Sequence, residues 1–147
     1  MSDSYFINQP VASTSIGVLS DGIWRIPHLA AFFPIAIRQL SRWQRSPPTD
    51  VAWVAAWGYR PSRRRVEHYA TRHKLPILTI EDGFVRSIGL GQQGDAPMGL
   101  VLDDVGIYFD ARRSSRLERL IAQGHDQTER AAHCMSLLRL HYLSGSV

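Results

Sequence analysis

Apolar residues along the chain gather in short runs that predict buried strands. Residues 51–57 form a nearly continuous apolar run, which is typical of a strand buried on both faces of a sheet. Residues 76–80 repeat this pattern, and residues 15–19 predict a first strand. Two shorter runs, at residues 100–102 and 106–109, predict two further strands that meet at an Asp-Asp pair.

Between these runs, the spacing of polar and apolar positions predicts helices. The first follows Pro27, a residue tolerated at the first helical position, and carries apolar side chains on a broad face. Because Pro34 lies inside it, we expect this helix to be kinked or split. The expected helices are residues 28–42, 61–74, 114–122 and 128–143, and the expected loops are residues 20–25 and 46–50.

The alternation of strands and helices with short connections predicts the α/β fold class, a parallel sheet with flanking helices. In such a sheet, right-handed crossovers bring the carboxyl ends of the parallel strands to one edge. Trp57-Gly58 and Glu81-Asp82 follow two of the predicted strands, so we expect them at the same edge. Because open sheets bind ligands outside this edge, the pattern predicts one polar crevice built from two distant segments.

The composition indicates a globular protein but does not identify a ligand. The 147 residues are 44% apolar and 20% charged, which suits a globular domain. No apolar run reaches the roughly 20 residues of a membrane-spanning helix, and the first residues lack the features of a secretion signal. Cys134 is the single cysteine, so no internal disulfide can form. We therefore expect a cytoplasmic protein.

The basic excess consists almost entirely of arginine. Lysine and arginine number 17 against 13 acidic residues, and Lys74 is the single lysine. Arginine binds carboxylates and phosphates at two points, so the composition weakly favours an anionic partner. The arginines are scattered, with one cluster at residues 63–65, and no nucleic-acid motif accompanies them. We therefore expect no nucleic-acid partner.

Three polar segments are candidates for chemistry, and one of them is Asp103-Asp104 running into residues 106–110. Glu81-Asp82-Gly83 ends a predicted strand, where functional side chains are common, and Gly83 permits a tight turn. Arg86 can then bind an anionic group. From spacing alone, an ordinary acidic turn that Arg86 neutralises in an ion pair explains the same residues at least as well. The second segment contains Gly22, Trp24, Arg25 and His28.

Asp103-Asp104 admits two interpretations. A magnesium ion accepts one or two carboxylates, but adjacent residues on a strand face opposite sides, and aspartates in a β-turn explain the pair equally well. The histidines lack the spacing of zinc ligands, and the sequence has neither a glycine-rich phosphate loop of the Walker type nor a complete dinucleotide fingerprint. We expect no metal and no cofactor.

Several of these segments occur together in one known family. In order and with roughly its spacing, residues 15–121 resemble the amino-terminal half of a capsule polysaccharide biosynthesis glycosyltransferase module, the β-Kdo transferases of Gram-negative bacteria. The resemblance implies a GT-B-like pair of Rossmann-like domains, a CMP-Kdo donor and a glycolipid acceptor, a lyso-phosphatidylglycerol carrying Kdo. It also implies retention through a covalent sugar–enzyme intermediate on an aspartate. The matching segments are residues 22–29, 56–62, 81–91, 100–111 and 115–118.

The resemblance also implies roles for the polar residues. Glu81 and Asp82 match the family's acidic-glycine motif as catalytic residues, and Asp82 is expected to handle the acceptor proton. Arg86 is expected to balance the carboxylate of Kdo or the phosphate of the acceptor. The remaining substrate-binding residues implied are Gly22, Trp24, Arg25, His28, Gly83 and Ser87.

One departure from the family affects the expected activity. The family's His-Pro motif and its expected nucleophilic aspartate lie in the second domain, and this sequence contains no His-Pro dipeptide. We expect residues 1–14 to be a disordered leader and residues 15–123 to be a Rossmann-like acceptor-side domain. Residues 124–147 are expected to be a helical tail, truncated before the donor-binding domain. With half a cleft, the chain is expected to be inactive alone.

The expected partners are the nucleotide sugar and the glycolipid acceptor, together with capsule assembly proteins. The alternative function is a non-catalytic module that binds an anionic glycan or phospholipid. Residues 63–65 are either a contact for anionic head groups, giving peripheral association with the inner membrane, or a solvated helix face.

Overall fold

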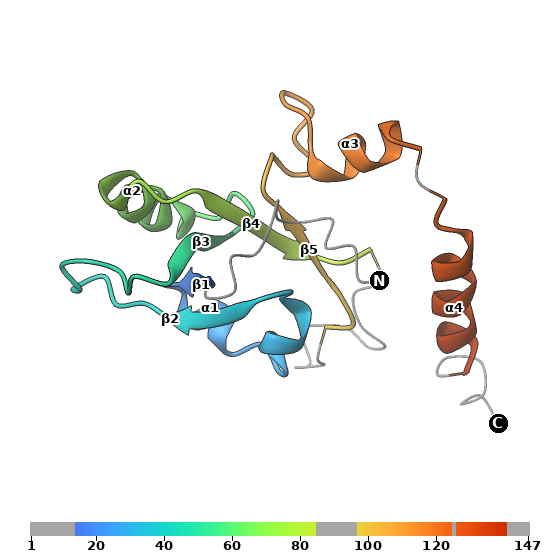
Figure 1. The fold of residues 1–147 in the computed structure, drawn as a ribbon, viewed down its shortest axis with the longest axis horizontal. Coiled ribbons are helices and arrows are strands. Elements are labelled where there is room, and N and C mark those ends of the chain that lie inside the picture. Colours follow the sequence, from blue (N-terminus) through green and yellow to red (C-terminus); the bar gives the residue numbers. More distant parts are fainter. Residues whose placement is uncertain (1–13, 85–96, 125, 141–147) are drawn as a thin grey trace.

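A five-stranded sheet forms the centre of the computed structural model, which describes residues 14–84, 97–124 and 126–140 (Figure 1). The strands lie in the order β2-β1-β3-β4-β5. The first four strands run parallel, and β5 is antiparallel to β4. The strands are β1 (Ser15–Val18), β2 (Ala36–Gln39), β3 (Val51–Trp57), β4 (Ile77–Asp82) and β5 (Leu100–Asp103).

Helices lie on both sides of this sheet, which confirms the α/β fold class. The helix α2 packs against β3 and β4, whereas α1 and the 3-10 helix η1 lie on the other side (Figure 1). Toward the carboxyl end, α3 and then α4 follow β5, and α4 lies apart from the sheet (Figure 1). The helices are α1 (Asp21–Trp24), η1 (Leu29–Phe32), α2 (Arg63–His73), α3 (Arg116–Ala122) and α4 (Thr128–Leu138).

The apolar runs predicted β1, β3 and β4 because these strands are buried on both faces. In β3, Ala55 belongs to one buried cluster, while Val54 and Ala56 belong to a second cluster on the opposite face. The first cluster joins β1, β3, β4 and β5 to α1 and η1, and the second joins β3 to α2. A strand between two cores needs apolar side chains at nearly every position, which produces the continuous pattern.

The helix predicted for residues 28–42 is wrong. The structure has η1 there, followed by Pro34 and the strand β2. Proline lacks the backbone N–H that a continuing helix needs, so the chain leaves the helical path and becomes extended. The β2 strand pairs only with β1 among the described residues, and its mostly exposed side chains fit an edge position. The predicted loop at residues 20–25 likewise contains the one-turn helix α1.

The strand predicted for residues 106–109 is also wrong, because a side chain ends β5 and turns the chain. Asp103 Oδ1 accepts the backbone N–H groups of Val105 at 2.8 Å and Gly106 at 2.7 Å. These hydrogen bonds form an Asx turn, which takes the amides that a further strand would give to the sheet.

The remaining predicted helices are confirmed over their described residues. The helix α2 occupies most of residues 61–74, and α3 begins with a capping box in which Ser115 and Glu118 exchange hydrogen bonds. The helix α4 follows Asp126, which accepts the Thr128 N–H at 2.9 Å. Residues 141–143 of the last predicted helix lie outside the described residues. No helix in the described part of the chain is long and apolar enough to cross a membrane.

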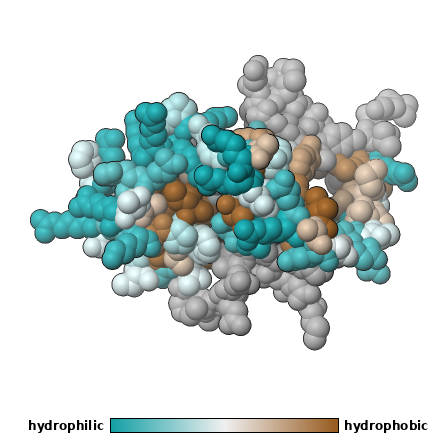
Figure 2. Space-filling model, turned by 90° about the horizontal axis from the view of Figure 1, so that it is seen from above, coloured by the Kyte–Doolittle hydropathy of each residue, from teal (hydrophilic) through white to brown (hydrophobic). Residues whose placement is uncertain are grey.

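The face seen in Figure 2 is largely hydrophilic, with hydrophobic groups showing between the polar side chains in separate patches. Exposed hydrophobic side chains also occur on α3 and α4, for example Ile121 and Met135. The division of the chain into a leader, an acceptor-side domain and a helical tail stays a prediction.

Candidate functional site

The carboxyl ends of β3 and β4 meet at one edge of the sheet, as the sequence predicts. Trp57 and Ile80 are partners in the parallel register, and the Gly58 N–H donates to the Ile80 carbonyl at 2.9 Å. Trp57-Gly58 and Glu81-Asp82 therefore lie side by side although 24 positions separate Trp57 from Glu81 in the sequence. This edge is where open α/β sheets bind their ligands.

Glu81 is held in place by its two neighbours across the strands. The Trp57 indole N–H donates to Glu81 Oε1 at 3.0 Å. On its other side, Glu81 Oε2 occupies the space where a Cβ on residue 58 would stand, and Gly58 has the positive φ of +36° that favours glycine. Glycine at position 58 thus lets the Glu81 carboxylate approach the backbone, and the contact fixes the orientation of that carboxylate.

Asp82 lies on the opposite face of the strand from Glu81, because side chains alternate along β4. It shares its face with Ile80 and Leu78, which belong to the cluster packed by Trp24 and Trp57. Both carboxylates are half-buried. The Trp57 indole, which packs on that same cluster, binds the Glu81 carboxylate, so both acidic residues lie at the edge beside Trp57.

The Gly83 turn is tight for a steric reason. The Gly83 N–H donates to the Gly99 carbonyl at 3.0 Å, and a Cβ on residue 83 would lie 2.8 Å from that carbonyl oxygen. Only a residue without a side chain allows the chain after β4 to approach the segment before β5 so closely.

The structure separates the other predicted binding residues. The Trp24 indole donates to the Val18 carbonyl at 3.3 Å and packs on the first cluster, so this side chain holds α1 against the sheet. Gly22 lines a cavity on the α2 side. Arg25 is exposed, and so is His28, which has a φ of +55° at the start of η1. Trp24 packs on the same cluster as Trp57 and Ile80, and Arg86 and Ser87 lie outside the described residues. Their roles stay predictions.

A second group of residues lies at this edge, and its pairing was not predicted from the sequence, although Asp110 belongs to a candidate segment. The Tyr59 hydroxyl donates to Asp110 Oδ2 at 2.7 Å, across 51 positions of sequence. Arg112 binds the same carboxylate through Nε at 2.8 Å and Nη2 at 3.2 Å. Hydrogen bonds from Arg112 and then Tyr59 hold the pKa of Asp110 well below its usual range, and the same bond to Asp110 raises the pKa of Tyr59. No local spacing signals this pairing.

Arg63 connects the start of α2 to the same edge. Its Nη1 donates to the Gly58 carbonyl at 2.8 Å and to Thr79 Oγ1 at 3.2 Å, and its guanidinium lies over the Tyr59 ring, 5.0 Å from the centroid. Arg63 is also paired with Glu67 one helical turn later. Arg63 therefore differs from its neighbours in the cluster at residues 63–65, since it faces the sheet.

Four exposed aromatic side chains lie in contact beside these polar groups. The ring centroids are 5.7 Å apart for Tyr59 and Phe109, 5.4 Å for Phe109 and Tyr108, and 4.9 Å for Tyr108 and Phe84. Phe109 also approaches Gly58. Aromatic surface next to a few fixed polar groups is typical of a small-molecule site.

The turn interpretation of Asp103-Asp104 is the one that the structure shows. Besides the two amides in its own turn, Asp103 accepts the Arg116 N–H at 2.8 Å. Asp104 binds the Arg116 side chain at 2.7 and 2.6 Å. Both carboxylates thus accept hydrogen bonds from N–H groups of the protein. Over the described ranges, no three His, Cys, Asp or Glu side chains gather into a metal site.

Comparisons with known proteins place the chain in a family. Residues 52–137 match the family described as capsule polysaccharide biosynthesis protein. The capsule polysaccharide modification protein LipA of Neisseria meningitidis serogroup A is 37% identical over 129 residues, which are 85% of this chain and 18% of the relative. The lipopolysaccharide-processing protein LpsZ of Rhizobium meliloti is 41% identical over 93 residues, 60% of this chain and 21% of the relative.

Solved structures agree with this match. The β-Kdo 2,4 transferase of Thermosulfurimonas dismutans KpsC superposes with a TM-score of 0.70 at 34% identity, covering 88% of this chain and 40% of that one. The β-Kdo 2,7 transferase of the same KpsC gives a TM-score of 0.51 at 30% identity, covering 86% and 42%. The chain spans about a fifth of the length of the curated relatives it matches. The resemblance found in the sequence is confirmed: the chain belongs to the capsule polysaccharide biosynthesis protein family.

Proposed function

We propose that the chain forms the acceptor-side part of a β-Kdo transferase, which moves Kdo from CMP-Kdo to a glycolipid acceptor during capsule biosynthesis. The observation that carries the proposal is the likeness to a β-Kdo 2,4 transferase, at 34% identity over 88% of this chain. Capsule modification proteins among the relatives support the same process. In this proposal, residues 15–123 are the acceptor-side domain and residues 124–147 its helical tail.

The edge formed by β3 and β4 supports different roles for the carboxylates of Asp82 and Glu81. Asp82 takes the proton of the acceptor hydroxyl as that oxygen attacks the anomeric carbon of Kdo, a role that requires a carboxylate within hydrogen-bond reach of the hydroxyl. Glu81, which Trp57 fixes at 3.0 Å, orients the edge and the groups around it. The exposed rings beside Gly58 offer apolar surface to a sugar.

The proposed reaction needs two groups from a second domain. A carboxylate nucleophile there attacks the anomeric carbon, CMP leaves, and the acceptor oxygen then displaces the nucleophile, so configuration is retained. That domain also binds the cytidine nucleotide. The partners in this proposal are therefore the sugar nucleotide and the glycolipid, and the protein acts in the cytoplasm, peripherally at the inner membrane.

A hybrid enzyme tests the proposal. The chain replaces the matching segment of the KpsC β-Kdo 2,4 transferase, and Kdo transfer from CMP-Kdo to a Kdo-terminated lyso-phosphatidylglycerol is followed by mass spectrometry. We expect the hybrid to transfer Kdo, Asp82→Asn to abolish transfer, and the chain alone to transfer none. Asp50→Asn is the matched control, because Asp50 lies at the other end of β3 and pairs with Arg38 on the surface.

Binding separates this function from a non-catalytic module. Titration of the chain alone with the same acceptor is expected to show saturable binding that Asp82→Asn weakens. A folded hybrid without transfer, together with acceptor binding by the chain, would establish the anionic-glycan module instead. An active Asp82→Asn hybrid would remove Asp82 from the proposed role.

A further inference from the structure

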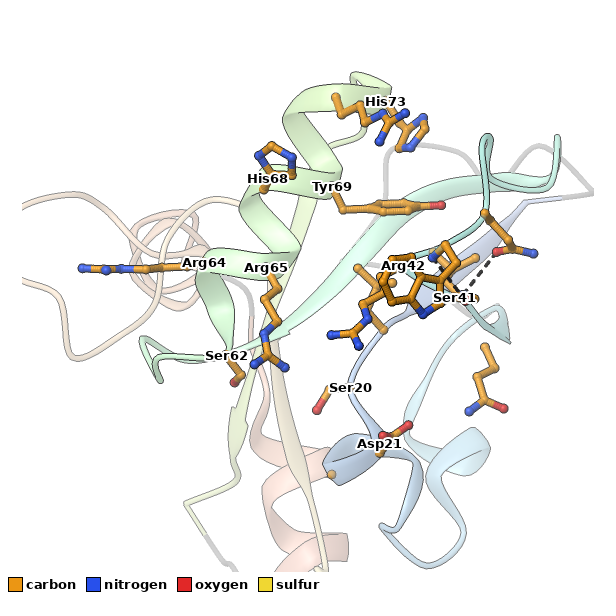
Figure 3. Close-up of a pocket in the computed structure, with 17 residues that line it drawn as sticks. Ser20, Asp21, Ser41, Arg42, Ser62, Arg64, Arg65, His68, Tyr69 and His73 are labelled. Carbon is orange, nitrogen blue, oxygen red and sulfur yellow. Dashed lines mark hydrogen bonds between the residues drawn. The ribbon is translucent and has the colours of Figure 1, made fainter.

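A cavity of about 1110 Å³ lies on the α2 side of the sheet, away from the edge of β3 and β4 (Figure 3). One wall is α2, and the other is built by the residues that follow β1 and β2. Neither Glu81 nor Asp82 lines it. The cavity is therefore a separate feature, and nothing in the proposed transfer reaction uses it.

Positive charge dominates the lining. Arg64, Arg65 and Arg72 come from α2, and Arg42 comes from the opposite wall. Asp21 is the only carboxylate among the described residues that line the cavity. Arg42 and Arg65 point into the same space from opposite walls (Figure 3). A hollow lined by one sign of charge focuses the field and concentrates ions of the opposite sign.

Among the described residues, these arginines lack acidic partners, and the guanidinium of Arg42 lies over the Trp43 ring, 4.7 Å from its centroid. Within the part of the chain that the structure describes, none of Arg42, Arg65 and Arg72 forms an ion pair with a carboxylate. By contrast, Arg63 on the same helix is fully engaged at the sheet edge. The cavity thus holds guanidinium groups whose strong two-point donors lack an acidic acceptor.

We propose that this cavity binds a ligand carrying a phosphate group, which Arg42 and Arg65 hold from opposite walls. A phosphate has enough oxygens and negative charge to accept from two guanidinium forks at once, whereas a single carboxylate has two oxygens. The cavity is larger than a phosphate, so the group belongs to a larger molecule, either a soluble phosphate ester or a phospholipid head group.

The test uses the full chain and two probes that distinguish these sources. Inorganic pyrophosphate is titrated calorimetrically, and co-sedimentation is measured with phosphatidylcholine vesicles that contain or lack phosphatidylglycerol. We expect Arg65→Gln and Arg42→Gln each to weaken binding about tenfold or more. Arg119→Gln is the matched control, since it removes the same charge from an exposed position on α3, and we expect less than a twofold effect.

Thermal unfolding of each free variant separates binding from folding. Arg42 and Arg65 are exposed, so we expect their substitution to leave the unfolding temperature of the free chain unchanged while affinity falls. Pyrophosphate binding with this pattern of variants supports a soluble phosphate, and vesicle binding alone with the same pattern supports a lipid head group. Binding of neither probe, an equal loss with Arg119→Gln, or full affinity in Arg65→Gln and Arg42→Gln would overturn the proposal.

Discussion

Asp103 is the buried carboxylate that holds the connection from β5 to α3. It is 1% exposed, and it accepts the backbone N–H groups of Val105, Gly106 and Arg116 at 2.8, 2.7 and 2.8 Å. Replacing Asp103 with alanine leaves these donors without their acceptor and removes a charge that satisfies all of them. We therefore expect Asp103→Ala to be strongly destabilising.

The size of the effect follows from the burial of each donor. A hydrogen bond to a charged acceptor contributes about 1.5–3 kcal/mol, and the loss is largest where water cannot replace the acceptor. Gly106 is buried, whereas Val105 and Arg116 are half-buried and can be hydrated in part. We expect Asp103→Ala to lower the free energy of unfolding by about 4 kcal/mol. Asp103→Asn keeps one accepting oxygen and should cost about 2 kcal/mol.

Urea unfolding followed by tryptophan fluorescence measures both values, provided that the denaturant slope is the same for each variant. Asp126→Ala is the matched control. Asp126 also accepts a backbone N–H, that of Thr128 at 2.9 Å, but it is exposed, so water can replace it and the loss should be clearly smaller. A cost below about 1 kcal/mol for Asp103→Ala, or one no larger than that of Asp126→Ala, would refute the reasoning.

Two other substitutions test the sheet edge. Gly58→Ala places a Cβ where Glu81 Oε2 lies, at a backbone φ of +36° that disfavours a side chain. We expect it to turn the Glu81 carboxylate away from the Trp57 indole and to weaken acceptor binding. In urea titrations it should lower the free energy of unfolding by about 1–2 kcal/mol. Asp110 has a lowered pKa, so its contribution to stability is full above about pH 4, its unfolded value, and is lost as the pH falls toward its lower folded value. Asp110→Asn should therefore flatten the acid side of a plot of melting temperature against pH, and an unchanged plot would contradict this.

Burial on both faces made part of the fold predictable from the sequence. The β3 strand lies between two cores, so nearly every position is apolar and the run stands out. Parallel pairing then brings Gly58 and Glu81 to one edge by topology alone. What the pattern could not supply was the side-chain geometry, such as the Trp57 indole reaching Glu81.

The failures have equally physical causes. Residues 28–42 have a helical spacing of apolar positions, but Pro34 stops the helix, and the exposed edge strand β2 carries too few buried residues to show a strand pattern. Residues 106–109 have the composition of a strand, but Asp103 takes the local amides. The bond between Tyr59 and Asp110 spans 51 positions, and no local rule reaches that distance.

The strand order explains why this small sheet carries two different surfaces. After β1 the chain moves to β2 on one side, whereas β3 leads through α2 to β4 on the other, so the segments that follow β1 and β3 diverge. Such a divergence leaves a crevice in open α/β sheets. Here the β1 and β2 side contributes to the arginine-lined cavity, and the β3 and β4 side carries Glu81, Asp82 and the exposed rings.

Arg63 lies at the boundary between these two surfaces, because it belongs to α2, which forms one wall of the cavity, but binds Gly58 and Thr79 at the sheet edge. A substitution at Arg63 would therefore disturb the carboxylate edge, whereas Arg65 two positions later belongs to the cavity, and the two surfaces can be altered independently from a single helix.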